Sequence, residues 1–181
     1  MKKLSVVALA VAVALLPAST FAACPDENGP HNVFPFVYYT YHFGTGCAGT
    51  GGDVEETTLS CESTPGHQFT QGSGSVSYSM TAPSGRGGSL WHATVFVDFS
   101  DPHSSSLNAI SATVFVYHNS SLTAYETFMS HSGNQGSLVC ERFDSSALTV
   151  QDGDTVEVVY TGDNYYSDTT MKISTPIIFA N

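Results

Sequence analysis

Residues 89–99 read SLWHATVFVDF, and this stretch decides the fold class. Apolar side chains occupy every second position from Trp91 to Phe99. Because successive side chains of a β-strand point to opposite faces of the sheet, the alternation gathers them on one face. The stretch therefore predicts a strand that buries one face in a core, and that face consists of Trp91, Ala93, Val95, Val97 and Phe99.

Part of this stretch recurs in the segment NAISATVFVYH, residues 108–118, where ATVFV occupies residues 112–116. Both faces of ATVFV are mostly apolar, which is typical of a strand that is covered on both sides. The residues that flank the two copies do not match. We therefore interpret the recurrence as two central strands with similar burial, not as an internal duplication.

Strand-like composition continues on both sides of these two segments, and helical periodicity is absent. In GSVSYSMT, residues 74–81, alternation places Val76, Tyr78 and Met80 on one face. The Asp-Gly pair in QDGD, residues 151–154, predicts a hairpin turn, and TAPSGRGGS, residues 81–89, predicts a long flexible loop. Further strands are expected at NVFPFVYYTYHF (32–43), DVEETTLSC (53–61), SLTAYETFM (121–129), GSLVCERF (136–143), ALTV (147–150), DTVEVVY (154–160) and MKISTPIIF (171–179).

Strands at this density, with no helix between them, predict an all-β fold. We expect one antiparallel β-sandwich domain of about nine or ten strands over residues 23–181, with jelly-roll or Ig-like topology both open. No composition shift or linker divides this range. Disulfides are expected to staple the domain.

The first 22 residues have the layout of a secretory signal peptide. Lys2 and Lys3 precede an apolar run over residues 4–16, which Pro17 ends. The run is shorter than the roughly 20 residues that span a bilayer, and no comparable run follows, so no membrane span is expected. We predict cleavage after Ala22 and a secreted or periplasmic product.

All four cysteines, Cys24, Cys47, Cys61 and Cys140, follow the predicted cleavage point. An even number in an exported chain indicates two disulfides with three connectivities. Cys47–Cys61 with Cys24–Cys140 is one arrangement, and a Cys61–Cys140 bridge between neighbouring strands is a rival. The sequence FAAC also resembles a bacterial lipobox, but Phe21 replaces its usual aliphatic residue and lipidated Cys24 would leave three thiols, so we favour a disulfide.

The chain is acidic, with 16 carboxylates and a formal net charge of −11. Loss of Lys2 and Lys3 would leave three cationic side chains, which are Arg86, Arg142 and Lys172. Nucleic acids and anionic lipids are bound through Lys and Arg that replace their counterions. The composition therefore excludes nucleic acid as an expected partner.

Sequence motifs of common enzymes are absent from the chain. There is no Gly-x-Ser-x-Gly, His-Glu-x-x-His, Cys-x-x-Cys, phosphate loop or EF-hand pattern. Seven histidines are scattered without metal-ligand spacing. This pattern favours a non-catalytic protein without a resident cofactor.

Two acidic loops carry the side chains that a cation would use. DFSDPH contains Asp98 and Asp101, and TGDNYYSD contains Asp163 and Asp168. Carboxylates at strand ends suit Ca²⁺, which takes several oxygen ligands in flexible geometry. The same residues favour turns through bonds to their own backbone, so calcium and ordinary turn formation both remain open.

Tyrosines supply the candidate ligand-binding residues, which are Tyr38, Tyr39, Tyr41, Tyr165 and Tyr166. Their rings combine an apolar face with a polar tip, which suits stacking on sugars. We therefore predict an exported recognition module whose partner is a glycan or a protein. A hydrolase with a site built from distant loops and a structural or interaction protein of the envelope are the alternatives.

Overall fold

The computed structural model describes residues 26–33, 36–42, 54–59 and 65–180. The predicted leader, its cleavage point, and Cys24, Cys47 and Cys61 lie outside these ranges. Within them, no helix is long and apolar enough to cross a membrane.

Thirteen strands and one 3₁₀ turn make up the described part of the chain, which is more strands than expected. They are β1 (Asp26–Val33), β2 (Phe36–His42), β3 (Val54–Thr58), β4 (Pro65–Phe69), β5 (Gly72–Thr81), β6 (Gly88–Ser100), β7 (Ala109–His118), β8 (Ser121–Ser132), η1 (Gly133–Gln135), β9 (Leu138–Asp144), β10 (Leu148–Val150), β11 (Thr155–Asn164), β12 (Thr170–Ser174) and β13 (Ile177–Ala180).

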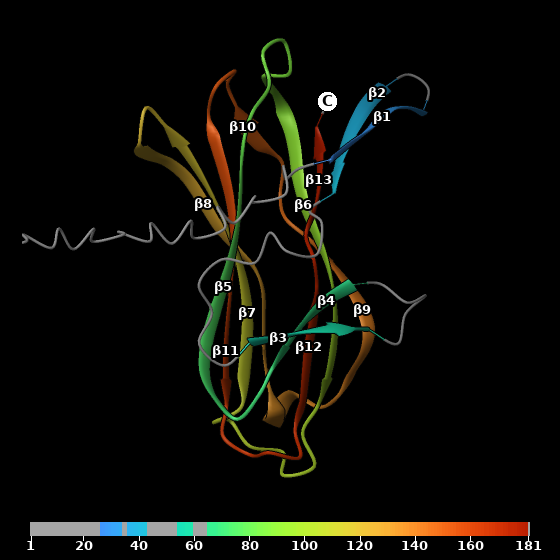
Figure 1. Cartoon of the computed structure of the whole chain (residues 1–181), viewed down its shortest axis with the longest axis vertical. Coiled ribbons are helices and arrows are strands. Elements are labelled where there is room, and N and C mark those ends of the chain that lie inside the picture. The colour runs from blue at the N-terminus through green and yellow to red at the C-terminus, as the bar shows by residue number, and fades with distance from the viewer. Residues whose placement is uncertain (1–25, 34–35, 43–53, 60–64, 181) are drawn as a thin grey trace, which may run out of the picture.

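The strands form two antiparallel sheets that face each other, which confirms the predicted all-β sandwich (Figure 1). The larger sheet has the order β1-β2-β13-β6-β12-β4-β3, and β9 and β10 also pair with β6. The smaller sheet has the order β5-β11-β7-β8. Strand β6 is therefore the hub of the larger sheet, because four other strands pair with it.

The core lies between the two sheets and is built from the faces that alternation predicted. All five residues of the β6 face, from Trp91 to Phe99, are buried. Val76, Tyr78 and Met80 of β5 are buried as well. The Trp91 indole N–H donates a hydrogen bond of 3.1 Å to the Arg86 carbonyl, so this large side chain is buried without losing its polar partner.

The interpretation of ATVFV as covered on both faces is wrong for the copy in β7. Ala112, Val114 and Val116 point into the core and are fully buried, whereas Thr113 and Phe115 are only partly buried. The smaller sheet packs one face against the larger sheet, and β7 lies inside it between β11 and β8. Composition alone therefore did not reveal that its second face meets solvent.

The hairpin predicted at QDGD is also wrong. The turn forms, with Gly153 at a positive φ of 82°, but the strands that it joins lie in different sheets. Strand β10 pairs with β6, and β11 pairs with β5 and β7. Local turn chemistry fixes the reversal of the chain, but it does not choose the partners of the flanking strands.

The segment MKISTPIIF, predicted as one strand, forms two. Strand β12 ends at Ser174 and β13 begins at Ile177, so Thr175 and Pro176 interrupt them. Proline lacks the N–H that a ladder needs, and the Thr175 N–H turns instead to the Pro65 carbonyl at 3.0 Å. Strands β1 and β4 lie largely or wholly outside the segments predicted as strands.

The loop predicted at 81–89 is anchored by one carboxylate. Asp152 accepts the N–H groups of Gly85, Arg86 and Gly87 at 2.7, 3.1 and 2.6 Å. These backbone bonds, chiefly those from Gly85 and Gly87, outweigh the opposing effect of desolvation and lower the pKa of Asp152. Because Asp152 lies in the 151–154 turn, the bonds tie two loops together at one end of the sandwich.

Cys140 is the one cysteine in the described part of the chain, and it is disulfide-bonded. Its partner lies outside the described residues. The connectivity of the four cysteines and the stapling of the domain therefore remain predictions.

Replacement of Gly162 by alanine tests the contact between the sheets. Gly162 is buried in β11, and a Cβ there would overlap the ring of the fully buried Phe69. We expect Gly162→Ala to lower the free energy of unfolding by about 1–3 kcal/mol, because overpacking a rigid core costs that much. Urea unfolding measures it, with the exposed Ser79→Ala as control. A loss no larger than that of the control would contradict the close packing.

Replacement of Asp152 by asparagine tests the loop anchor through pH. The pKa of Asp152 in the folded protein is depressed. Its carboxylate therefore stabilises the fold fully at pH values above the ordinary pKa of aspartate. This stabilisation disappears as the pH falls through the pKa of the folded state. We expect Asp152→Asn to lower the Tm at neutral pH and to match the unmodified protein in strong acid. Melting curves across pH measure this, with Ser84→Ala as an uncharged control. A difference in Tm that is constant with pH would rule out the charged anchor.

Candidate functional site

Three of the predicted ligand-binding tyrosines lie on β2 in the larger sheet. By backbone register, Tyr38 pairs with His31 of β1. Tyr39 and Tyr41 pair with residues of β13 on the other side. Their strand is two places away from the central β6 in the sheet order.

The other two predicted tyrosines, Tyr165 and Tyr166, lie in the connection from β11 to β12 at the opposite end of the sandwich (Figure 1). The β13 residue that pairs with Tyr41 is opposite Ala93 of β6, whereas β12 reaches Ser100. At about 3.3 Å per residue, these two points of β6 are about 23 Å apart. The structure therefore does not bring the two sets of tyrosines together.

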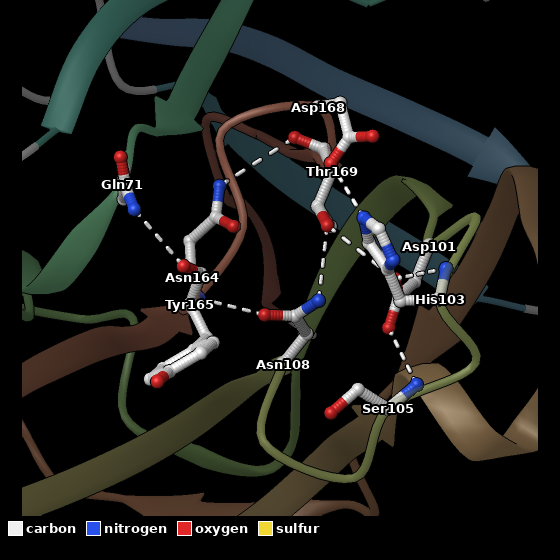
Figure 2. A network of polar contacts seen from close by, with 9 residues as sticks. All are labelled: Gln71, Asp101, His103, Ser105, Asn108, Asn164, Tyr165, Asp168 and Thr169. Carbon is white, nitrogen blue, oxygen red and sulfur yellow. Dashed lines mark hydrogen bonds and ion pairs between the residues drawn. The ribbon is translucent and has the colours of Figure 1, made fainter.

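Side-chain amides hold the loop connections at the Tyr165 end in place (Figure 2). The buried Asn108 amide donates to the Thr169 hydroxyl at 2.9 Å, and its carbonyl oxygen accepts the Tyr165 N–H at 2.7 Å. The Asn164 amide donates to the Phe69 carbonyl at 2.9 Å. These contacts join the connections β6–β7, β11–β12 and β4–β5.

Beside this scaffold lies a group of side chains that we call the loop-end cluster, namely the exposed His103, Tyr165 and Asp168 and the partly buried Tyr166. His103 Nε2 contacts the Asp168 carboxylate at 2.9 Å. The His103 ring lies against Tyr166, with ring centroids 4.0 Å apart, and Tyr166 meets Tyr165 edge to face at 5.0 Å. Tyr165 is 61% exposed. The cluster presents aromatic rings and a carboxylate to solvent on a rigid base.

Asp101 is buried beneath this cluster and serves the loop itself. Its two oxygens accept the N–H groups of His103 and Ser105 at 2.9 and 2.8 Å. Burial raises the pKa of Asp101, but the bonds from Ser105 and His103, with a further bond from Asn108, outweigh it and lower the pKa below the ordinary value. Asp101 is therefore a charged turn anchor.

The other carboxylates predicted to bind a metal are spread over this end of the fold. Asp98 is buried on β6 and accepts the Cys140 N–H at 2.6 Å. Asp163 is exposed on β11, and Asp168 contacts His103. Within the described ranges, no three or more His, Cys, Asp or Glu side chains are arranged to hold a metal ion. Backbone N–H groups donate to one oxygen of Asp98 and to both oxygens of Asp101. Calcium binding remains a prediction.

A second surface, which the sequence analysis missed, lies on the outer face of the smaller sheet. Phe115 and Tyr117 follow each other on the outer side of β7, and Tyr125 of β8 lies directly opposite Phe115. The Phe115 ring is 6.2 Å from each of the other two, with planes inclined by 24° and 21°. Tyr125 is 67% exposed. We call these three residues the aromatic row.

Serine and threonine hydroxyl groups make up much of the remainder of this face, and we call these positions the hydroxyl rows. Ser111 and Thr161 share a hydrogen bond of 2.7 Å between β7 and β11, and Thr113 and Thr127 share one of 2.9 Å between β7 and β8. On β5 the outward positions form a continuous series of hydroxyl-bearing residues, which are Ser73, Ser75, Ser77, Ser79 and Thr81.

Glu157 joins the aromatic row to the hydroxyl rows. Glu157 is a residue of β11, and it pairs with Phe115 of β7 on one side and with Ser79 of β5 on the other. Burial, followed by the nearby charge and acceptor of Glu157, raises the pKa of Tyr117 above its ordinary value. Tyr117 therefore remains a neutral phenol beside Glu157.

Aromatic rings beside hydroxyl and carboxylate groups are the combination that binds sugars, since the rings pack on C–H faces and the polar groups bond the sugar hydroxyls. The signal was present in the sequence as aromatic residues at alternate positions of TVFVYH and in TAYETF. It was missed because both faces of ATVFV were assigned to the interior.

The fold and these surfaces define an antiparallel β-sandwich with one open, aromatic- and hydroxyl-bearing sheet face. No protein-family model and no curated protein matches the chain. Solved structures of similar shape include the C-terminal CBM6 of LamC, a marine laminarinase from Zobellia galactanivorans, with a TM-score of 0.44 and 11% identity over 80% of this chain and 99% of that chain.

TmCBM61 in complex with β-1,4-galactotriose has a TM-score of 0.46 and 11% identity over 73% of this chain and 86% of that one. CsCBM6-3 from Clostridium stercorarium in complex with cellobiose has a TM-score of 0.41 and 10% identity over 74% of this chain and 88% of that chain. At these TM-scores, the likeness carries no argument about what this chain binds.

Replacement of Asn108 by alanine tests the scaffold of the loop end. The substitution removes the buried amide, so the Thr169 hydroxyl loses a donor and the Tyr165 N–H loses its acceptor. We expect the free energy of unfolding to fall by about 1–3 kcal/mol, the cost of buried unsatisfied polar groups. Chemical denaturation measures it, and Ser106→Ala, at an exposed position in the same loop, is the control. Equal stability of the two variants would show that the network does not hold the loops.

Proposed function

We propose that this protein is a non-catalytic recognition module that binds a glycan through the aromatic row and the hydroxyl rows of the smaller sheet. Export from the cytoplasm by way of the leader over residues 1–22 is part of the same proposal. Binding needs no cofactor, because the contacts come from side chains of the sheet itself.

The observation that carries this proposal is the geometry of the aromatic row. Phe115, Tyr117 and Tyr125 come from two neighbouring strands, and both ring pairs are inclined by less than 25°. Rings that lie in nearly parallel planes on an accessible sheet face can pack against the apolar faces of sugar rings. Exposed apolar residues that gather in one patch mark interaction sites, whereas scattered ones are ordinary. The aromatic row is such a patch, and it suits a ligand that is itself partly apolar.

The positions of the carboxylates on this face favour binding over glycoside cleavage. Cleavage uses two carboxyl groups roughly 5–9.5 Å apart. Glu157 and Asp163 are the carboxylates on the outer side of β11, and they are six positions apart along the strand. At about 3.4 Å per residue this separates them by about 20 Å. This spacing supports recognition without hydrolysis.

Removal of two rings of the aromatic row tests the proposal. We expect Phe115→Ala and Tyr125→Ala each to weaken glycan binding about tenfold or more, because truncation of a central aromatic contact costs more than about 1.4 kcal/mol. A glycan array identifies the ligand, and isothermal titration calorimetry measures the affinities.

Tyr165→Ala is the matched control, since it removes an equally exposed tyrosine from the loop-end cluster. It should leave the affinity unchanged. No binding across the array, or binding that is lost with Tyr165→Ala and retained with Phe115→Ala, would refute the assignment of the binding surface.

A further inference from the structure

The outer face of the smaller sheet extends well beyond the aromatic row. Its cross-strand rows, read in the order β5, β11, β7 and β8, are Thr81–Thr155–Tyr117–Leu122, Ser79–Glu157–Phe115–Tyr125, Ser77–Val159–Thr113–Thr127, Ser75–Thr161–Ser111–Ser130 and Ser73–Asp163–Ala109–Ser132. The distance along β7 from Tyr117 to Ala109 is about 27 Å at 3.4 Å per residue. A carbohydrate ligand that covered this length would contain several sugar rings.

The two ends of the face differ in chemistry. The first two rows contain the aromatic row and Leu122, which is 50% exposed. Beyond Phe115 the outward residues are chiefly serine and threonine, and the bond between Ser111 and Thr161 lies about 14 Å from Phe115 along the strand. A ligand that uses both ends must therefore be extended.

The charges of the face restrict the ligand further. Among its described residues, Glu157 and Asp163 are charged, and none is Lys, Arg or His. A uronate or sulfated sugar would meet carboxylates without the cations that bind such groups. For a neutral chain the polar groups of the face are hydroxyl groups and carboxylates, which accept its hydroxyl protons.

From these three observations we infer that the ligand of this face is an uncharged, extended oligosaccharide that lies along the strands from the aromatic row to the Ser111–Thr161 pair. The inference rests on the proposed function and adds the class and length of the glycan. A second copy of the chain is a poorer occupant, because a symmetric contact would bring the carboxylates of two identical faces together without cations.

Calorimetry with oligosaccharides of defined length tests this inference. The probes are neutral oligomers of glucose, galactose, mannose and xylose from one to six units, and hexamers of galacturonate and mannuronate. We expect at least one neutral hexamer to bind about tenfold or more tightly than its dimer. Its affinity should not change between low and high salt, because no charge pairs are formed. The charged hexamers should bind at least tenfold more weakly.

A paired substitution at the far end of the face locates the extra contacts. Ser111→Ala with Thr161→Val removes the hydroxyl pair without touching the aromatic row. We expect this variant to lose affinity for the hexamer severalfold and to bind the dimer unchanged. Thr149→Val, an exposed position on β10 in the other sheet, is the matched control, and melting curves verify that all variants fold.

The outcomes separate this inference from the proposed function. Binding that needs Phe115 but is equal for dimer and hexamer, or is as tight for a charged hexamer, overturns the inference and leaves glycan recognition standing. Absence of any binding, or binding that Phe115→Ala does not weaken, overturns both. Sedimentation of the free protein as a dimer that Phe115→Ala dissociates would assign the face to a second copy.

Discussion

Packing of β6 against β7 and β11 is the interaction on which the rest of the structure depends. The inner side chains of these strands are almost completely buried. They run from Trp91 to Phe99 on β6, from Ile110 to Val116 on β7 and from Val156 to Tyr160 on β11. Strand side chains alternate, so fixing the inner face also fixes what points outward. The aromatic row of β7 is outward because its neighbours Val114 and Val116 are inward. The proposed binding surface is thus a consequence of the register that builds the core.

That constraint also separates the two surfaces of this molecule. The loop-end cluster is assembled from connections, and buried groups such as Asn108 and Asp101 hold it in place. The outer face of the smaller sheet needs no such support, because backbone ladders to both neighbours hold β7 and β11. Rigid strands position side chains more accurately than loops do. This difference favours the sheet face as the place where an extended ligand is recognised.

Sequence periodicity was sufficient for the fold class and for the inner faces of β5 and β6, because alternation is a local property. It failed where the answer depended on distant partners. The second face of β7 was assigned to the core, because the sequence around Phe115 does not show whether another element covers that face. The QDGD turn was expected to pair β10 with β11, yet those strands pair with β6 and β5. Tyr41 and Tyr165 were grouped by composition, although strand register places them far apart. The aromatic row was missed for the same reason. Tyr125 lies beside Phe115 only because β8 pairs with β7 in this register.

The central claim is that ligand contacts the outer face of the smaller sheet and not the loop end. Hydroxyl-radical footprinting with mass-spectrometric detection, with and without the bound neutral hexasaccharide, tests it most directly in the unmodified protein. We predict that oxidation of Phe115 and Tyr125 falls when ligand is bound, while that of Tyr165 stays the same. Protection of Tyr165 and Tyr166 with an unprotected Tyr125 would contradict it.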